Sequence, residues 1–253
     1  MSNNTMQQAA VIIQKYFRAY EVRKKYTVRD LEKNEKTSYN ATIIGNDPYI
    51  SNALDSYKTE QKIAFISVSS MRIVDIACQI TSDTKHTPKI IVIDNSSKVS
   101  NLWRNIRAFS EKNNTSAENF LKVLPALLND NREFFLEKSF NYIASQRTDY
   151  IPIVKRGEIL RFNANAITFF KYLFEKYSFE KVMKIILGAT VICQSWTDTN
   201  TLVSVKNVLN SIGIEKIYMY PSNLVACFGD DKEIQMEILE NIKKNRPFYY
   251  SAY

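Results

Sequence analysis

Short apolar runs alternate with amphipathic stretches along the middle of the chain. IAFISV (63–68), KIIVID (89–94) and ATVICQ (189–194) are runs of six residues each, and such runs are typical of strands buried on both faces of a parallel sheet. Between the first two, MRIVDIACQI (71–80) has apolar residues at helical spacing. Strand, helix and strand within about 30 residues predict a βαβ unit.

Helical patterns occupy much of the remaining chain. We expect a helical insertion over about 100–148 and further helical sequence over 165–187. Asp198 is expected to cap a helix that Gly213 ends, and a last amphipathic helix is predicted over 231–244.

The last strands are predicted to form an antiparallel hairpin. EKIYMY (215–220) and NLVACF (223–228) flank Pro221 and Ser222, which favour a turn. The fold class is therefore α/β, a Rossmann-like, mostly parallel sheet with a terminal antiparallel hairpin. We assign it to residues 41–253, and assign residues 1–40 to an N-terminal helix and linker.

The N-terminal helix is predicted over residues 8–26, followed by a polar linker over 27–40. The net charge of the chain is +8, and residues 1–26 hold five basic residues against one acidic, a net of +4. Nucleic-acid-binding domains usually spread basic residues over a folded face. A cation cluster within one helix instead indicates a ligand for an acidic partner, so nucleic acid is not the expected partner.

This helix contains the pattern IQxxxRAxxxRxxY. The residues are Ile13, Gln14, Arg18, Arg23 and Tyr26. The pattern resembles the IQ motif that binds calmodulin and related EF-hand proteins, with Ala19 in place of the family's glycine. The resemblance covers residues 9–26. It implies calmodulin as the partner and a hydrogen bond from Gln14 to the backbone of the bound lobe.

The physical chemistry of the helix agrees with such a partner. Ile13, Phe17 and Tyr20 recur at helical spacing, as apolar anchors in a hydrophobic groove do. Arg18 and Arg23 would face the acidic rims of an EF-hand lobe. Two other interpretations stay open: the helix packs on its own domain, or it lies on an anionic membrane.

Composition excludes several common sites. No two of the five glycines are close together, so glycine-rich phosphate-binding loops are excluded. The single histidine, His86, excludes conventional zinc sites, and no metal is expected. The three cysteines form no CxxC pair, which favours a reduced, cytoplasmic protein. The sequence shows no apolar run of spanning length and no signal peptide, so we expect no membrane span.

The order of elements over about 60–244 resembles class I S-adenosylmethionine-dependent methyltransferases. Residues 73–80 imitate the first motif of that family. Only eight residues, 81–88, would then remain before the strand 89–94, too few for a crossover helix, so 71–80 is assigned to the helix. The segment NDPY (46–49) imitates the (N/D)PPY motif but lacks one proline, and we interpret it as a turn.

The resemblance implies S-adenosylmethionine as cofactor and suggests where it would bind. Ser67, Ser69 and Ser70 occupy the first strand-to-helix turn, where the family has a glycine-rich loop. Asp94, followed by Asn95, ends the second strand, where the family's acidic residue binds the cofactor ribose. Asp94 could equally cap the next segment.

Gln194 ends the third strand and Trp196 comes just after it, at the same edge of the sheet. They are the last candidate cofactor contacts. The alternative is that Trp196 belongs to the core and that Asp198 is only a helix cap.

Three functions are open at this point. The first is a calmodulin-regulated, methyltransferase-like enzyme. The second is a non-catalytic binding protein that retains the fold without cofactor, such as a secreted bacterial effector in the cytosol of a host cell. The third is another α/β enzyme that its partner activates. The sequence indicates no catalytic residue and no methyl acceptor.

Overall fold

The computed structural model describes residues 31–33, 35–37, 49–50, 62–68, 71–81, 86–112, 116–127, 159–160, 166–214, 216–221, 224, 231–244 and 248–249. The predicted N-terminal helix (8–26) lies outside the described residues. No helix within these ranges is long and apolar enough to cross a membrane.

A five-stranded sheet lies at the centre of the fold. Its strands are β2 (Ile63–Ser67), β3 (Lys89–Ile93), β5 (Thr190–Ile192), β6 (Lys216–Tyr220) and β7 (Phe248–Tyr249). The order is β5-β3-β2-β6-β7, and each neighbouring pair is parallel. This order is that of a doubly wound, Rossmann-like sheet, so the α/β prediction is confirmed. A separate antiparallel pair joins β1 (Tyr49–Ile50) to β4 (Ile159–Leu160).

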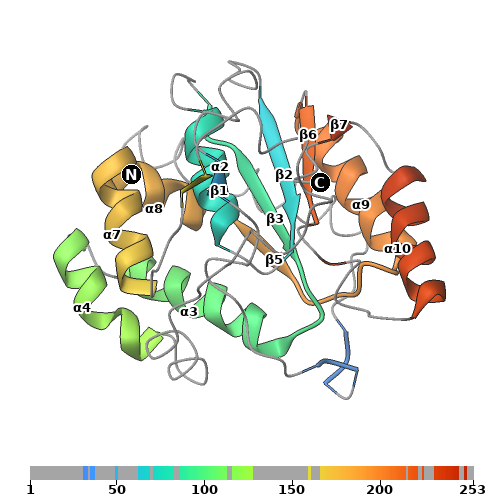
Figure 1. Ribbon diagram of the computed structural model, residues 1–253, viewed down its shortest axis with the longest axis horizontal. Coiled ribbons are helices and arrows are strands. Elements are labelled where there is room, and N and C mark those ends of the chain that lie inside the picture. The colour runs from blue at the N-terminus through green and yellow to red at the C-terminus, as the bar shows by residue number, and fades with distance from the viewer. Residues whose placement is uncertain are drawn as a thin grey trace, which may run out of the picture.

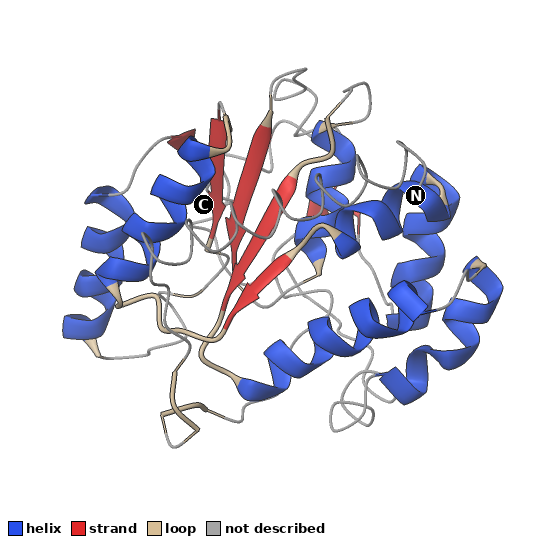
Figure 2. Cartoon of the chain, turned by 180° about the vertical axis from the view of Figure 1, so that it is seen from behind, coloured by secondary structure: helices blue, strands red, loops and turns tan. Residues whose placement is uncertain are grey.

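Helices cover both faces of the sheet (Figures 1 and 2). One face carries α2 (Arg72–Ile80), α3 (Ser97–Lys112), α4 (Ala117–Leu127), α7 (Ala166–Tyr177) and α8 (Phe179–Leu187). The other face carries α9 (Thr199–Ser211) and α10 (Lys232–Lys244). The assignment of 71–80 to a helix is confirmed, as are α9 and α10. Of the predicted helical insertion, α3 and α4 are described.

Burial on both faces explains the continuous apolar runs. Ile63 and Phe65 of β2 belong to the core cluster that includes α2 residues, whereas Ala64 and Ile66 belong to the cluster that includes α9 residues. All four side chains are buried. Because successive residues of a strand point to opposite faces, every position of β2 is apolar up to its last residue.

The thicker helical layer is packed around aromatic rings. Phe120 of α4 is fully buried and its ring centroid lies 5.2 Å from that of Phe170 and 5.6 Å from that of Phe174. Both partners belong to α7. Edge-to-face packing of this kind adds to area burial, and it fixes α4 against α7.

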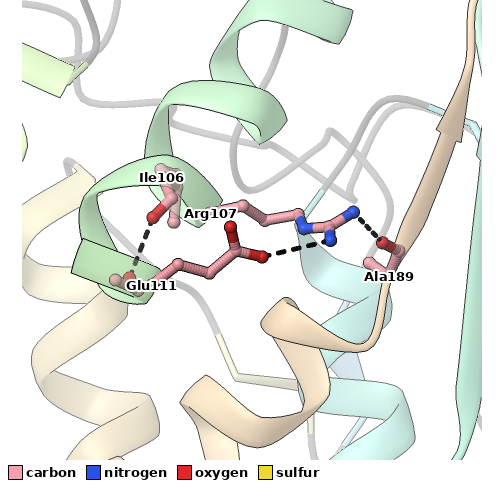
Figure 3. A network of polar contacts seen from close by, with 5 residues as sticks. Ile106, Arg107, Glu111 and Ala189 are labelled. Atoms are coloured by element: carbon pink, nitrogen blue, oxygen red, sulfur yellow. Dashed lines mark hydrogen bonds and ion pairs between the residues drawn. The ribbon is translucent and has the colours of Figure 1, made fainter. Parts of the chain in front are cut away.

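A polar contact holds this layer to Ala189, the residue just before β5 (Figure 3). Arg107 of α3 donates from Nη1 to the carbonyl oxygen of Ala189 at 2.7 Å, and its Nη2 lies 3.3 Å from a carboxylate oxygen of Glu111. The arginine thus joins the middle of α3 to the chain just before β5.

The predicted terminal hairpin is wrong for β6. Both edges of this strand carry parallel partners, β2 on one side and β7 on the other, so Tyr218 and Met219 are already paired in both directions. The physical reason is burial: Ile217–Tyr220 are buried on both faces of the sheet, as in a central parallel strand. Most of the proposed second strand, 223–228, lies outside the described residues.

Candidate functional site at the carboxyl edge of the sheet

The candidate site residues come together at one edge of the sheet. Because the strands are parallel, β2, β3, β5 and β6 all end there. Ser67 is the last residue of β2, Asp94 follows β3, and Gln194 lies two residues after β5. The strand order reverses between β2 and β6, which is where ligands bind in folds of this type. The sequence therefore placed these residues at the correct edge.

Asp94 acts as a local cap. Only 4% of its surface is exposed, and its Oδ1 accepts a hydrogen bond of 2.9 Å from the backbone N–H of Ser96. This bond closes a turn between β3 and α3, as Asp side chains commonly do. The structure thus agrees with the capping interpretation of Asp94.

An N-terminal segment crosses this edge, and we call residues 31–33 and 35–37 the strap. The Leu31 N–H donates to the carbonyl oxygen of Cys193 at 2.8 Å, just after β5. The Thr37 N–H donates to the carbonyl oxygen of Asn95 at 3.0 Å, and the Ser97 N–H returns a bond to the Thr37 carbonyl at 3.0 Å. The part of the linker that is described is therefore bound to the sheet.

Side chains add to the strap's attachment. The Thr37 hydroxyl donates to Oδ1 of Asn95 at 3.2 Å, and the Ser97 hydroxyl donates to the Thr37 carbonyl at 3.2 Å. Thr37 also forms an isolated parallel bridge with Ser96. The strap thereby continues the hydrogen-bonding pattern of the sheet beyond the end of β3.

The loop after β5 is fixed by buried polar contacts. Gln194 accepts at Oε1 from the N–H of Ser195 at 2.8 Å. Trp196 is 3% exposed and its Nε1 donates to the carbonyl of Ile93 at 2.8 Å. Asn241 of α10 donates from Nδ2 to the Trp196 carbonyl at 2.8 Å. Trp196 is thus a core residue that joins two strands and a helix.

The described candidate residues for S-adenosylmethionine already make hydrogen bonds within the protein. The Ser67 hydroxyl is fully buried and donates to the carbonyl of Val68 at 2.9 Å. One polar side-chain atom of each remaining described candidate also makes a hydrogen bond within the protein. These residues are Asp94, Asn95, Gln194 and Trp196. A ribose diol would need an accessible carboxylate at Asp94. Ser69 and Ser70 lie outside the described residues.

A second polar cluster joins α2 to α7 and α8. Asp75 is 1% exposed and accepts a hydrogen bond of 2.8 Å from the hydroxyl of Tyr177. Lys181 donates from Nζ to the carbonyl of Cys78 at 3.0 Å. Burial raises the pKa of the Cys78 thiol from 9.0 to about 12, so Cys78 is not a nucleophile at neutral pH.

The described ranges contain no group of three acidic, histidine or cysteine residues that could hold a metal ion.

Sequence reasoning missed Leu31, Thr37 and Asn241 at this edge. Residues 27–40 have the polar composition of a linker, and a single Thr among charged residues predicts no pairing with Asn95, 58 positions later. Asn241 interrupts an otherwise amphipathic helix and is 2% exposed. A polar residue on the apolar face of a predicted helix is the one signal that could have identified it.

In comparisons with known proteins, no family model matches the chain and no curated protein matches it.

Proposed function

We propose that this chain is a calmodulin-binding protein whose α/β domain serves as a binding domain rather than as a methyltransferase. The observation that carries the proposal is the pattern Ile13-Gln14, Arg18, Arg23 and Tyr26 on one predicted helix. Half of the net charge of +8 also lies within residues 1–26. An acidic, groove-forming EF-hand lobe complements such a helix in both shape and charge.

The proposed partner restricts where the protein works. Calmodulin is a cytosolic protein of eukaryotic cells, so the chain would meet it in the cytosol of its own cell or, as a secreted bacterial effector, of a host cell. A cytosolic setting agrees with the sequence's three cysteines and their lack of CxxC spacing.

Calorimetric titration with calmodulin, with and without calcium, tests the partner. We expect the double substitution Ile13→Ala/Gln14→Ala to weaken binding at least tenfold, because it removes an apolar anchor and a hydrogen-bonding amide, at about 1.4 kcal/mol per factor of ten. The control is Gln7→Ala/Gln8→Ala, which truncates two side chains just before residues 9–26 and should retain affinity. Equal affinities of the two double variants for calmodulin would contradict the proposal.

The non-catalytic half of the proposal rests on the hydrogen bonds of the carboxyl edge. Asp94, Asn95 and Gln194 use side-chain oxygens to cap turns and to hold the strap. Asp94 and Gln194 are also buried, with exposed fractions of 4% and 7%, so a ligand could reach them only after this edge opens.

A methyltransferase is the second candidate, and the strand order β5-β3-β2-β6-β7 is the observation that favours it. Thermal melting with millimolar S-adenosylmethionine decides between the two, because a ligand far above its Kd must raise the melting temperature. We expect no shift. A shift that Asp94→Ala abolishes would favour the methyltransferase instead.

A further inference from the structure

We propose that the strap links the partner to the sheet: an EF-hand protein bound to residues 9–26 releases the strap from the carboxyl edge at β3 and β5. This inference rests on the proposed calmodulin binding and adds its consequence for the α/β domain. It names a regulatory contact within the chain, formed by Leu31 and Thr37 with Cys193, Asn95 and Ser97.

The first step is proximity. Tyr26, the last residue of the motif, is five residues before Leu31, which already hydrogen-bonds the end of β5. Five residues span at most about 17 Å even when fully extended. A compact lobe of about 70 residues has a radius of gyration of about 11 Å. A lobe that contacts Tyr26 therefore lies within about 17 Å of Leu31 and so beside the carboxyl edge.

The second step is the strap's low intrinsic stability. None of its six described residues is buried, so it contributes little apolar contact. Its attachment includes backbone hydrogen bonds from Leu31, Thr37 and Ser97 and side-chain bonds between Thr37, Asn95 and Ser97. Segments with few buried contacts open locally at free energies well below that of global unfolding. We therefore expect the strap to detach before the rest of the edge opens.

The third step is what release would uncover. Removing the strap breaks the hydrogen bonds that it makes to the carbonyl oxygens of Asn95 and Cys193 and to the N–H of Ser97. These groups flank Asp94 and Gln194, at the edge where α/β sheets bind ligands. Partner binding would therefore convert an edge occupied by the protein's own backbone into one available to a ligand or a second protein.

Linkage gives the first test. If the partner must break the strap, then weakening the strap must tighten partner binding. Ser97→Ala removes the 3.2 Å bond from its hydroxyl to the Thr37 carbonyl. We expect it to increase calmodulin affinity about two- to tenfold, the factor that corresponds to one hydrogen bond.

Ser110→Ala is the matched control, because its hydroxyl also donates to a backbone carbonyl, that of Ile106 at 2.8 Å, but within α3. It should leave calmodulin affinity unchanged. Equal affinities for Ser97→Ala and the parent protein would overturn the inference.

Hydrogen exchange of the full-length protein gives the second test. On saturation with calmodulin we expect the amides of Leu31, Thr37 and Ser97 to exchange at least tenfold faster, while those of β2 stay protected. Binding with unchanged exchange at these amides overturns the strap inference and leaves the proposed function standing. Absence of calmodulin binding overturns both.

Discussion

The interior of the sheet around β2 and its carboxyl edge at β3 and β5 are held together by different forces. Around β2, apolar side chains from both helical layers bury every position of Ile63–Ser67. At the edge, Asp94, Trp196 and the strap are each held to neighbouring backbone by individual hydrogen bonds. The interior is stabilised by non-directional burial, and the edge by directional contacts.

The two regions therefore respond differently to substitution and to partial opening. Burial energy scales with area and is shared among many neighbours, so the interior opens only when the domain unfolds. A hydrogen bond contributes a net of about 0.5–1.5 kcal/mol, and several of the edge's partners come from a half-exposed segment. The edge can therefore open while the interior stays folded, which a set of substitutions can test.

Phe120→Ala should have the largest effect. The ring is fully buried and packs against Phe170 and Phe174, so its removal leaves a cavity and should lower the free energy of unfolding by about 3–5 kcal/mol. Lys122→Ala, at an exposed position of the same helix, is the control and should change it by less than about 0.5 kcal/mol. Urea denaturation measures both, and a loss at Phe120 no greater than the control's would contradict the interior half of the comparison.

Trp196→Phe should have an intermediate effect, because Trp196 belongs to both regions. Phenylalanine keeps most of the buried ring but cannot donate to the Ile93 carbonyl, which Nε1 reaches at 2.8 Å. An unsatisfied buried carbonyl costs about 1–3 kcal/mol. Urea denaturation should show that loss with an unchanged m-value. An unchanged free energy of unfolding would mean that Trp196 contributes by packing alone. Trp196 would then belong to the interior and not to the edge.

The interior could be predicted from the sequence because its forces leave a pattern. The apolar runs of β2 and β3 and the spacing of α2 follow directly from burial on two faces. The parallel pairing of β6 was missed because Pro221 suggested a turn, and the two residues of β7 are too few to show a period.

The edge was predictable only in part. The end of each buried strand placed Ser67, Asp94 and Gln194 at one edge, but the hydrogen bonds that occupy these residues were not evident. A bond between Thr37 and Asn95 joins positions 58 apart, and a single polar residue has no periodicity to indicate its partner.

The Cys78 thiol offers a pH-dependent measure of the interior. Burial, opposed by the nearby Lys181, raises its pKa from 9.0 to about 12. Its folded-state pKa is above its unfolded value, so the neutral thiol's contribution is fully present below pH 9 and is lost as pH rises from about 9 to 12, at about 1.4 kcal/mol per pH unit.

Cys78→Ala removes this titration while leaving the other alkaline groups in place. Between pH 8 and 10, the stability of the parent protein should therefore fall more steeply than that of the variant. Parallel stability curves would show that the thiol is not in a dry interior, and would weaken the contrast with the edge.

Thr37→Val should have the smallest effect on global stability and the most local one. Valine keeps the shape and the backbone bonds of Thr37 but loses the hydroxyl that donates to Asn95 at 3.2 Å. If the strap opens independently of the interior, the variant should unfold in urea within about 0.5 kcal/mol of the parent. The amides of Thr37 and Ser97 should nevertheless exchange severalfold faster. Thr199→Val, at an exposed position of α9, controls for the replacement itself and should leave both amides unchanged. A loss of global stability equal to the local change would show that strap and interior unfold as one unit, and the distinction between the two regions would fail.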